Sequence, residues 1–341
     1  MSAHIAIAGC AAFIFSTVVT AEPNAQESNW KLPRTEYGQP DLQGFWTNAT
    51  ITPLERAPEF GDRLVLKPEE ALALERGLAQ FREDQDKPTD PTHGIEDLPT
   101  ECGFGFSGVN CGYNAFWIDP GSKLITLNGE KRSSIVIEPK SGKVPPLTPA
   151  GQARLGYMYA GYVQADGPER RPLGERCLMS FDSSAGPPML PLLYNNMYQI
   201  VQTRDAVIIH IEMVHDTRIV SLNGKGAAAG ARRWMGQSVG RWEGDTLVIE
   251  TTNFRKEQIF RGAAENLKVT ERLTRVGPNQ IAYRFTIEDP TTFAQSWSGE
   301  LAFNATQERM HEYACHEGNY ALPGILAGAR EEEKAAAARK K

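Results

Sequence analysis

Apolar and polar residues alternate along the second half of the chain. Between Ala206 and Met213 one face of the segment is apolar, whereas Ile208, His210 and Glu212 share the other, as in a β-strand. The same period of two returns in the segments 246–254, 269–276, 280–288, 293–303 and 309–315. Tight turns rather than helices join these segments. We therefore predict a mainly β fold, in which an antiparallel meander closes into a lipocalin-like barrel that can enclose a ligand.

Two earlier segments have helical spacing instead. Residues 68–84 begin with Pro68 and two glutamates, which suit the first turn of a helix. Thr148 is the expected N-cap of a second helix over 148–163, and Pro149 follows it at the first position. We expect these helices at the periphery of the barrel.

The remaining segments complete the predicted organisation. Asn128-Gly129 is typical of the turn of a hairpin, here between 123–127 and 133–138. Residues 22–60 are rich in Pro and Asn and are expected to form an extended N-terminal arm. The predicted parts are a signal peptide (1–21), an arm, helix and loop (22–122), a β-barrel-like domain (123–320) and a charged helical tail (321–341).

The first residues predict export. The stretch from Ile5 to Val19 is mostly apolar, is too short to span a membrane, and leads to a small-residue cleavage site ending at Ala21. An alternative is a lipoprotein box at Cys10, which would tether the protein by a lipid. No later segment approaches ~20 apolar residues, so no membrane span is expected. We predict a periplasmic protein.

Charge and motifs restrict the expected partners. The net charge is −6, and the basic run is confined to the C-terminal tail, which argues against nucleic acid as a partner. The sequence lacks a P-loop, a glycine-rich dinucleotide fingerprint, a Gly-x-Ser-x-Gly elbow and a haem-attachment motif. We therefore expect no cofactor and a small molecule as the partner, with the oligomeric state left open.

Four cysteines remain after the signal peptide, and an oxidising compartment favours two disulfides. Cys102 and Cys111 bracket a glycine-rich loop, so we pair them locally and join Cys177 to Cys315. Free buried thiols are the alternative.

The densest polar segment, 208–218, carries the first candidate site. If the apolar face of its strand packs outward against helices, His210 and Glu212 line the barrel interior. A buried carboxylate needs a partner, and Arg176, Arg218 and Arg241 are candidates. Glu212 would then be a general base with a raised pKa. The alternative is a solvated strand face.

Two further segments add polar side chains. The segment 311–320 is one residue too long for a zinc-binding His-Glu-x-x-His motif, and it places His316 and Glu317 just after a predicted strand, where the mouth of a barrel would lie. Asn196 and Tyr198 could hydrogen-bond to a ligand, whereas turn chemistry is favoured for the neighbouring Asn195. A metal site assembled from His210, His215 and His316 is an alternative, although we predict no metal.

Read together, several motifs are similar to those of a large family of exported proteins from proteobacteria and acidobacteria. The motifs are Glu175-Arg176-Cys177, Tyr194-Asn195-Asn196-x-Tyr198, Glu212-x-x-His215-Asp216-Thr217-Arg218, Gly240-Arg241-Trp242-Glu243-Gly244-Asp245-Thr246-Leu247-Val248 and Cys315-His316-Glu317-Gly318-Asn319-Tyr320. The resemblance covers residues 33 to 320 and implies no particular activity. It adds weight to a group of polar residues: Arg176, Glu212, His215, Asp216, Arg218, Arg241, His316 and Glu317.

The sequence therefore favours a cofactor-independent lyase or isomerase that acts on a hydrophobic, oxygenated small molecule, such as a lignin-derived phenolic dimer. Glu212 or His316 would take a proton, with His215 beside them, and Arg218 or Arg241 would stabilise the oxyanion. Substrate binding is assigned to Tyr198, Asn196, Arg176, His210 and Glu317, and aromatic walls to Tyr113, Phe116, Trp117 and Trp234. The alternatives are a periplasmic protein that binds a hydrophobic ligand without turnover, and a metal-dependent hydrolase.

Overall fold

The computed structural model describes residues 30–85, 92, 101–103, 106–107, 119–180, 186–224 and 230–339. The predicted signal peptide with Cys10, the cysteine Cys111 and the aromatic residues Tyr113, Phe116 and Trp117 lie outside these residues. Among the helices of the described chain, none is long and apolar enough to cross a membrane.

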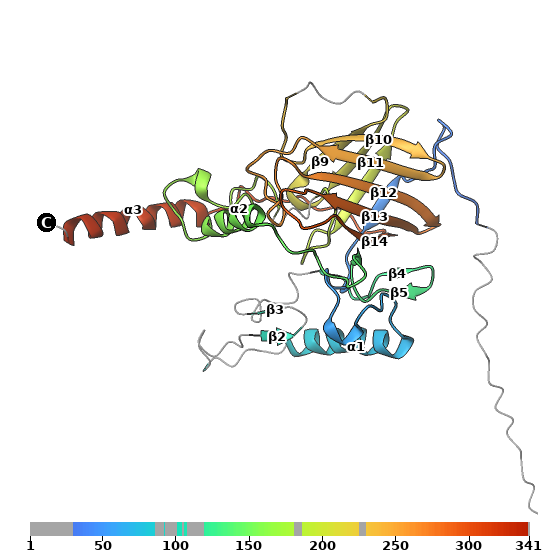
Figure 1. Ribbon diagram of the computed structural model, residues 1–341, viewed down its shortest axis with the longest axis horizontal. Coiled ribbons are helices and arrows are strands. Elements are labelled where there is room, and N and C mark those ends of the chain that lie inside the picture. Colours follow the sequence, from blue (N-terminus) through green and yellow to red (C-terminus); the bar gives the residue numbers. More distant parts are fainter. Residues whose placement is uncertain are drawn as a thin grey trace, which may run out of the picture. The chain divides into compact units, whose positions relative to one another are not determined.

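Nine strands of the described chain form a closed barrel (Figure 1). They are β1 (Gly44–Thr47), β7 (Met197–Gln202), β8 (Ala206–Ile211), β9 (Thr217–Ser221), β10 (Gln237–Glu243), β11 (Thr246–Thr252), β12 (Lys268–Gly277), β13 (Gln280–Glu288) and β14 (Trp297–Ala305). Each strand pairs with the next in this order, and β1 also pairs with β14, which closes the ring. The predicted mainly β barrel is confirmed. Its strand β1 comes from the segment expected to form the N-terminal arm.

Strand register defines two ends of the barrel. One end carries Thr47, Met197, Ile211, Thr217, Gln237 and Thr252, and we call it the Asp216 end. The opposite end carries the tight turn between β10 and β11, and we call it the Asp245 end. Predicted site residues can form one site only where they lie at the same end of the barrel.

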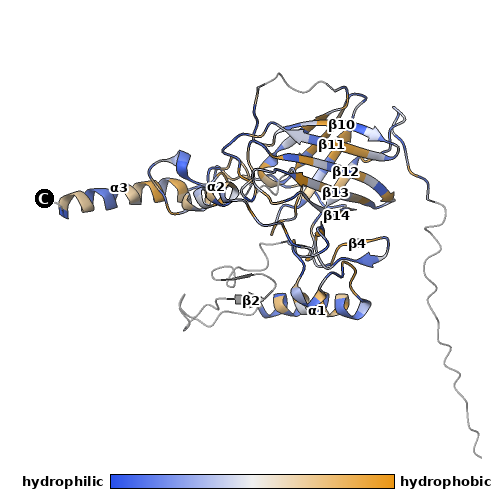
Figure 2. Ribbon diagram, in the orientation of Figure 1, coloured by the Kyte–Doolittle hydropathy of each residue, from blue (hydrophilic) through white to orange (hydrophobic). Residues whose placement is uncertain are grey.

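The interior of the barrel is a packed apolar core. Val207, Ile209 and Ile211 of β8 are fully buried, whereas His210, between them, is only half-buried on the outer face. The expectation that the apolar face of this strand packs outward is therefore wrong. The interior of a closed barrel is shielded from water on every side, so burying the aliphatic face there removes the most apolar surface from water. Figure 2 shows the apolar residues interspersed with polar ones along β11 to β13.

Two further expectations about the strands are wrong. Among the described strand pairs of the barrel, β9 and β10 run parallel and not antiparallel, so the chain returns to the Asp216 end between them. Residues 309–315 form no strand. They belong to a segment at 306–319, which we call the strap.

The predicted hairpin turn forms at Asn128 and Gly129, which both have positive φ, between β4 (Thr126–Leu127) and β5 (Glu130–Lys131). Residues 136–138 do not take part in that hairpin. They form β6 (Val136–Glu138), which pairs with β14 instead.

The predicted helices form at α1 (Pro68–Gln85) and α2 (Pro149–Ala160), and the tail forms α3 (Ala321–Arg339). The Thr148 hydroxyl caps α2 by accepting the Gly151 amide at 3.1 Å, as predicted. Short elements complete the described chain: β2 (Glu101–Gly103), β3 (Phe106–Ser107), η1 (Pro58–Phe60), η5 (Pro168–Arg170) and η7 (Met213–His215).

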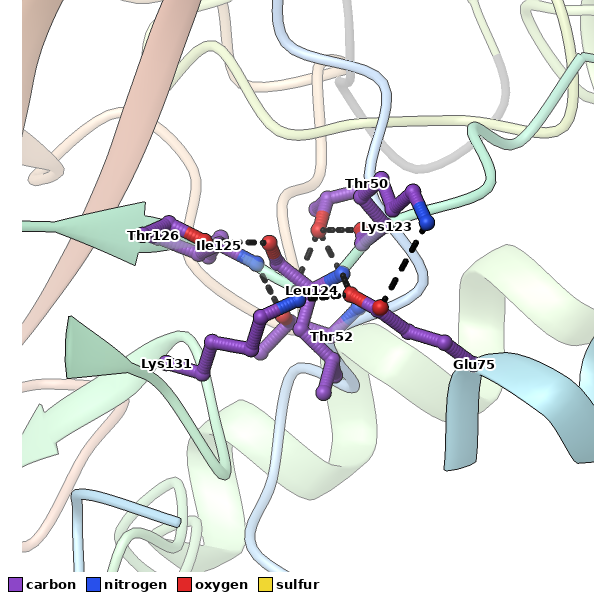
Figure 3. Close-up of polar contacts among 8 residues, drawn as sticks. All are labelled: Thr50, Thr52, Glu75, Lys123, Leu124, Ile125, Thr126 and Lys131. Atoms are coloured by element: carbon purple, nitrogen blue, oxygen red, sulfur yellow. Dashed lines mark hydrogen bonds and ion pairs between the residues drawn. The ribbon is translucent and has the colours of Figure 1, made fainter. Parts of the chain in front are cut away.

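The buried carboxylate of Glu75 in α1 contacts residues between 123 and 131 and positions the helix against them. Glu75 accepts the Leu124 amide at 3.1 Å and pairs with the ammonium groups of Lys131 and, at 3.5 Å, Lys123 (Figure 3). Burial acts to raise the pKa of Glu75, but its hydrogen bonds with Lys131 and Leu124 outweigh burial and hold that pKa below its ordinary value.

The predicted disulfide between Cys177 and Cys315 is confirmed, with the two Cα atoms 5.8 Å apart. The bond ties the strap to the loop that follows η5. Of the two predicted disulfides, this is the one whose cysteines both lie in the described chain.

Candidate functional site

A strained turn between β8 and β9 forms the centre of the candidate site. Val214 and His215 both adopt left-handed backbone angles, with φ of 60° and 47°. This conformation is unfavourable for a β-branched residue such as valine and needs support from its surroundings. Here the Glu212 amide donates to Met197 at 3.0 Å, and the Ile211 amide donates to Asp216 at 2.8 Å. The strain therefore persists because neighbouring strands hold the turn.

Asp216 follows this turn and is two residues before Arg218, whose side chain points to the barrel interior. The Oδ2 atom of Asp216 is buried and has no hydrogen-bond partner within the described residues. Burial raises the pKa of this carboxyl to about 6, against the opposing effect of His215. Such a carboxyl exchanges a proton close to neutral pH.

The strap closes over the turn from one side. Glu212 is buried and its carboxylate accepts the His311 amide at 2.9 Å. His215 contacts the Tyr313 carbonyl through Nδ1 at 3.1 Å. Burial raises the pKa of the Tyr313 hydroxyl, and a hydrogen bond with Tyr194 opposes this. Glu212 therefore positions the strap, which places the Tyr313 carbonyl beside the turn.

The disulfide adds another predicted motif to this end. The side-chain amide of Asn319 donates to the Glu175 carbonyl at 2.7 Å, next to the Cys177–Cys315 bond. Four of the predicted motifs thus meet at the Asp216 end: those at 175–177, 194–198, 212–218 and 315–320.

Inside the barrel, Arg218 makes a bidentate ion pair with Glu271 of β12, at 3.0 and 2.5 Å. Both side chains are almost completely buried. The Tyr283 hydroxyl donates to Glu271 at 2.8 Å and accepts the Met189 amide at 3.0 Å. Burial acts to lower the pKa of Arg218, but Glu271 outweighs it and the pKa is raised. The guanidinium is therefore already neutralised and is not an exposed oxyanion-binding group.

Other inward side chains extend this polar cluster. The Ser238 and Thr251 hydroxyls lie 3.3 and 3.4 Å from the Arg218 guanidinium, and Tyr198 accepts the Asn48 side-chain amide at 3.3 Å. Tyr198 is buried and packs edge-to-face on Phe303, at a centroid distance of 5.0 Å. In this packed arrangement Tyr198 stabilises the core and does not line an open pocket, contrary to its predicted role.

The sequence reasoning missed Glu271, Tyr283, Ser238, Thr251 and Asn48. One signal was present: Glu271 interrupts the apolar face of its strand between Val269 and Leu273, where a charged residue requires a buried partner. Asp216 was part of the motif group but was not singled out, because its burial depends on the turn before it.

Arg241 lies apart from the site, which corrects its predicted role. Its guanidinium is about half exposed on the outer face of β10 and pairs with Glu243 at 2.8 Å and Glu250 at 2.7 Å. Arg272 and Lys268 continue this ladder of alternating charges over neighbouring strands. Cross-strand neighbours of opposite charge satisfy Arg241 where it is, since its position in the alternation turns it outward.

The remaining predicted residues have other surroundings. The Asn196 side chain is saturated by backbone groups: it accepts the Leu192 amide at 2.7 Å and donates to the carbonyls of Asp119 and Leu192 at 2.9 and 2.8 Å. It therefore has no free group for a substrate. Arg176 reaches the Glu169 carbonyl at 3.5 Å.

His316 and Glu317 are exposed on the strap, and Trp234 stacks with Arg255 at 4.5 Å. Within the described residues no group of three or more His, Cys, Asp or Glu side chains is arranged to hold a metal ion, so His210, His215 and His316 do not form one.

Comparisons with known proteins add little to this picture. No protein-family model and no curated protein matches the chain. Among solved structures, the chain is similar to the crystal structure of the fluorescent protein UnaG N57A mutant, with 14% sequence identity and a TM-score of 0.23, over 33% of this chain and 72% of that one.

Proposed function

We propose that the protein is an enzyme that moves a proton on a small, oxygenated molecule, as a lyase or isomerase does, with Asp216 as the proton-transferring group. One observation carries the proposal: within the part of the chain that the structure describes, a buried oxygen of the Asp216 carboxyl has no hydrogen-bond partner, and Asp216 directly follows a strained turn. Strained backbone and perturbed carboxyls both cluster at functional sites. The proton transfer is thus assigned to Asp216, whereas the sequence alone favoured Glu212 or His316.

The chemistry needs no cofactor. The Asp216 carboxylate accepts a proton from a carbon next to a carbonyl group, and the electron pair of the broken C–H bond moves into that carbonyl. The same carboxyl then returns the proton to another carbon, or the electron pair expels a leaving group from the neighbouring carbon. A pKa of about 6 suits both directions at neutral pH. His215 lies at the turn, and its second ring nitrogen can accept a hydrogen bond from a hydroxyl group of the substrate.

The test measures proton exchange and turnover for a panel of phenolic dimers and hydroxylated ketones in D2O, followed by NMR. We expect deuterium to enter the substrate with wild-type protein, with a rate that rises through pH 6 and is then constant, because the base is active when deprotonated. Asp216→Asn should lower the rate by at least about 100-fold. Asp205→Asn, which changes an exposed aspartate in the turn between β7 and β8, is the matched control. Undiminished exchange by Asp216→Asn contradicts the proposal.

Binding without turnover is the second candidate, and the interior ion pair favours it. Because Arg218 and Glu271 neutralise each other, the buried charges require no catalytic role. In the same experiment, this candidate predicts a compound that binds to wild type and to Asp216→Asn equally and is recovered unchanged.

We also propose that the protein acts in the periplasm, and the Cys177–Cys315 disulfide supports an oxidising compartment. N-terminal sequencing of the protein from a periplasmic extract should begin at Glu22. A sequence that begins at Met1 contradicts cleavage after Ala21.

A further inference from the structure

An open groove follows the outer wall of the barrel and is separate from the Asp216 turn. It has a volume of about 680 Å³ and is lined on one side by β1, β7 and β8 and on the other by the first residues of the strap. Phe45, Gln199 and His210 are register partners in a row across these three strands. Asn279, in the turn between β12 and β13, also lines the groove.

The polar side chains of the groove are mostly neutral, and several of them are uncommitted, whereas the Gln43 side-chain oxygen accepts the Gln202 amide at 3.2 Å. Within the described chain, the side-chain amides of Gln199, Asn279 and Gln307 have no hydrogen-bond partner. His210 contacts the Thr217 hydroxyl through Nδ1 at 2.9 Å, which leaves its other ring nitrogen open to a ligand. Each amide offers a donor and an acceptor side by side. Such pairs match the neighbouring hydroxyl groups of a polyol.

The charges of the groove do not favour an ionic ligand. Arg275 donates to the carbonyls of Asp41 and Pro278, both at 2.8 Å, and its guanidinium lies over the Trp46 ring. It is therefore engaged by the protein itself. Glu308 and Arg309 carry opposite charges next to each other on the strap. A neutral ligand that forms many hydrogen bonds fits this lining better than an anion or a hydrocarbon.

One exposed aromatic ring completes the lining. Phe45 is 41% exposed, although a phenylalanine on a strand is commonly buried. Phe45 and Gln199 of β7 are register partners, so their side chains share the outer face of the barrel. The apolar C–H face of a pyranose ring packs on an aromatic ring while its hydroxyls reach amides at the edge, so the combination suits a sugar unit.

We propose that this groove is a binding site for a neutral oligosaccharide, with Phe45 as the stacking platform and Gln199, His210 and Asn279 as hydroxyl-binding groups. Because the groove is open at the surface, a chain of sugar units can extend beyond the unit that stacks on Phe45. The groove does not include Asp216, His215 or Tyr313, so the site is independent of the proposed proton transfer.

The test is calorimetric titration of the full exported chain with maltohexaose, cellohexaose and chitohexaose. We expect at least one of them to bind with a Kd below about 1 mM. Phe45→Ala and Gln199→Ala should each weaken that binding by about tenfold or more, whereas Phe45→Tyr, which keeps the ring, should stay within about threefold. Ile219→Ala removes an exposed aliphatic side chain of β9 outside the groove and should change nothing.

Two results overturn the proposal. One is that none of the three hexasaccharides binds to a protein whose thermal unfolding shows that it is folded. The other is that Phe45→Ala binds as well as wild type, or that Phe45→Tyr loses as much affinity as Phe45→Ala. Thermal unfolding of each variant separates lost binding from lost folding, and the exposure of Phe45 keeps its replacement compatible with the fold.

Discussion

At the scale of single residues, Asp216 combines features that lower stability. One oxygen of its carboxyl is buried and has no hydrogen-bond partner in the described chain, and the preceding residues Val214 and His215 are strained. Because the pKa of about 6 lies above the ordinary value of 3.8, the folded state binds more protons than the unfolded state between these two values. The free energy of unfolding therefore falls as the pH rises through this window, and the destabilisation is complete above pH 6.

Asp216→Asn should remove this destabilisation. We expect the free energy of unfolding to increase by about 1–2 kcal/mol at pH 7.5 and to change little at pH 4, since one pKa unit corresponds to about 1.4 kcal/mol and the carboxyl keeps some contact with water. Urea unfolding at the two pH values measures the difference, with Asp205→Asn as the control. Equal destabilisation by Asp216→Asn at both pH values would show that the carboxylate has a buried partner instead.

At the scale of elements, the attachment of α1 depends on one carboxylate. The apolar contacts of this helix with Leu66 and Leu124 form a small cluster outside the main core. Glu75 adds directional contacts there, because it accepts a backbone amide and pairs with Lys131. A small apolar cluster gives the helix little stability by itself, so the polar contacts define its position.

Glu75→Gln should lower the free energy of unfolding by about 1–3 kcal/mol at pH 7, because it leaves Lys131 beside a neutral group in a half-buried site. The effect should decrease on acidification, because the lowered pKa of Glu75 stabilises the fold only while the carboxyl is ionised. Lys123→Ala, at an exposed partner, should cost no more than about 0.5 kcal/mol. Hydrogen exchange of the α1 amides reports whether the loss is confined to this helix. A loss for Lys123→Ala as large as that for Glu75→Gln contradicts the assignment.

At the scale of the whole molecule, the Arg218–Glu271 pair joins strands β9 and β12 through the interior. Removing one member leaves an unpaired buried charge. Replacing both with apolar residues of similar size leaves no buried charge that needs a partner. We expect Arg218→Met alone to lower the free energy of unfolding by about 3–5 kcal/mol, and the double replacement with Glu271→Met to recover most of that loss.

Arg241→Met is the matched control for this experiment, because Arg241 makes ion pairs of similar length on the exposed outer face. It should cost only a small fraction of the loss for Arg218→Met, because water screens exposed ion pairs. Chemical unfolding of the four proteins measures these differences. A loss for Arg241→Met equal to that for Arg218→Met would contradict the view that burial, not ion pairing itself, makes the interior pair sensitive.

The sequence by itself determined the local features of this protein. Alternation of apolar residues predicted the strands 269–276 and 280–288, the Thr148 cap predicted the start of α2, and Asn128-Gly129 predicted a turn. These features depend on neighbours in the chain, which the sequence displays directly. The pairing of Cys177 with Cys315 also followed, because the other cysteines lie close together in sequence.

The tertiary structure alone decided which face of β8 is buried, which partner Arg218 has, and where Arg241 lies. Alternation defines two faces of a strand but does not say which one turns inward, since that depends on whether the sheet closes. The choice of Glu271 over Glu212 as the partner of Arg218 depends on the register of strands distant in sequence. For the same reason Asp216 became the centre of the candidate site: a carboxyl's burial, and with it the pKa, is a property of the packed turn and not of its sequence.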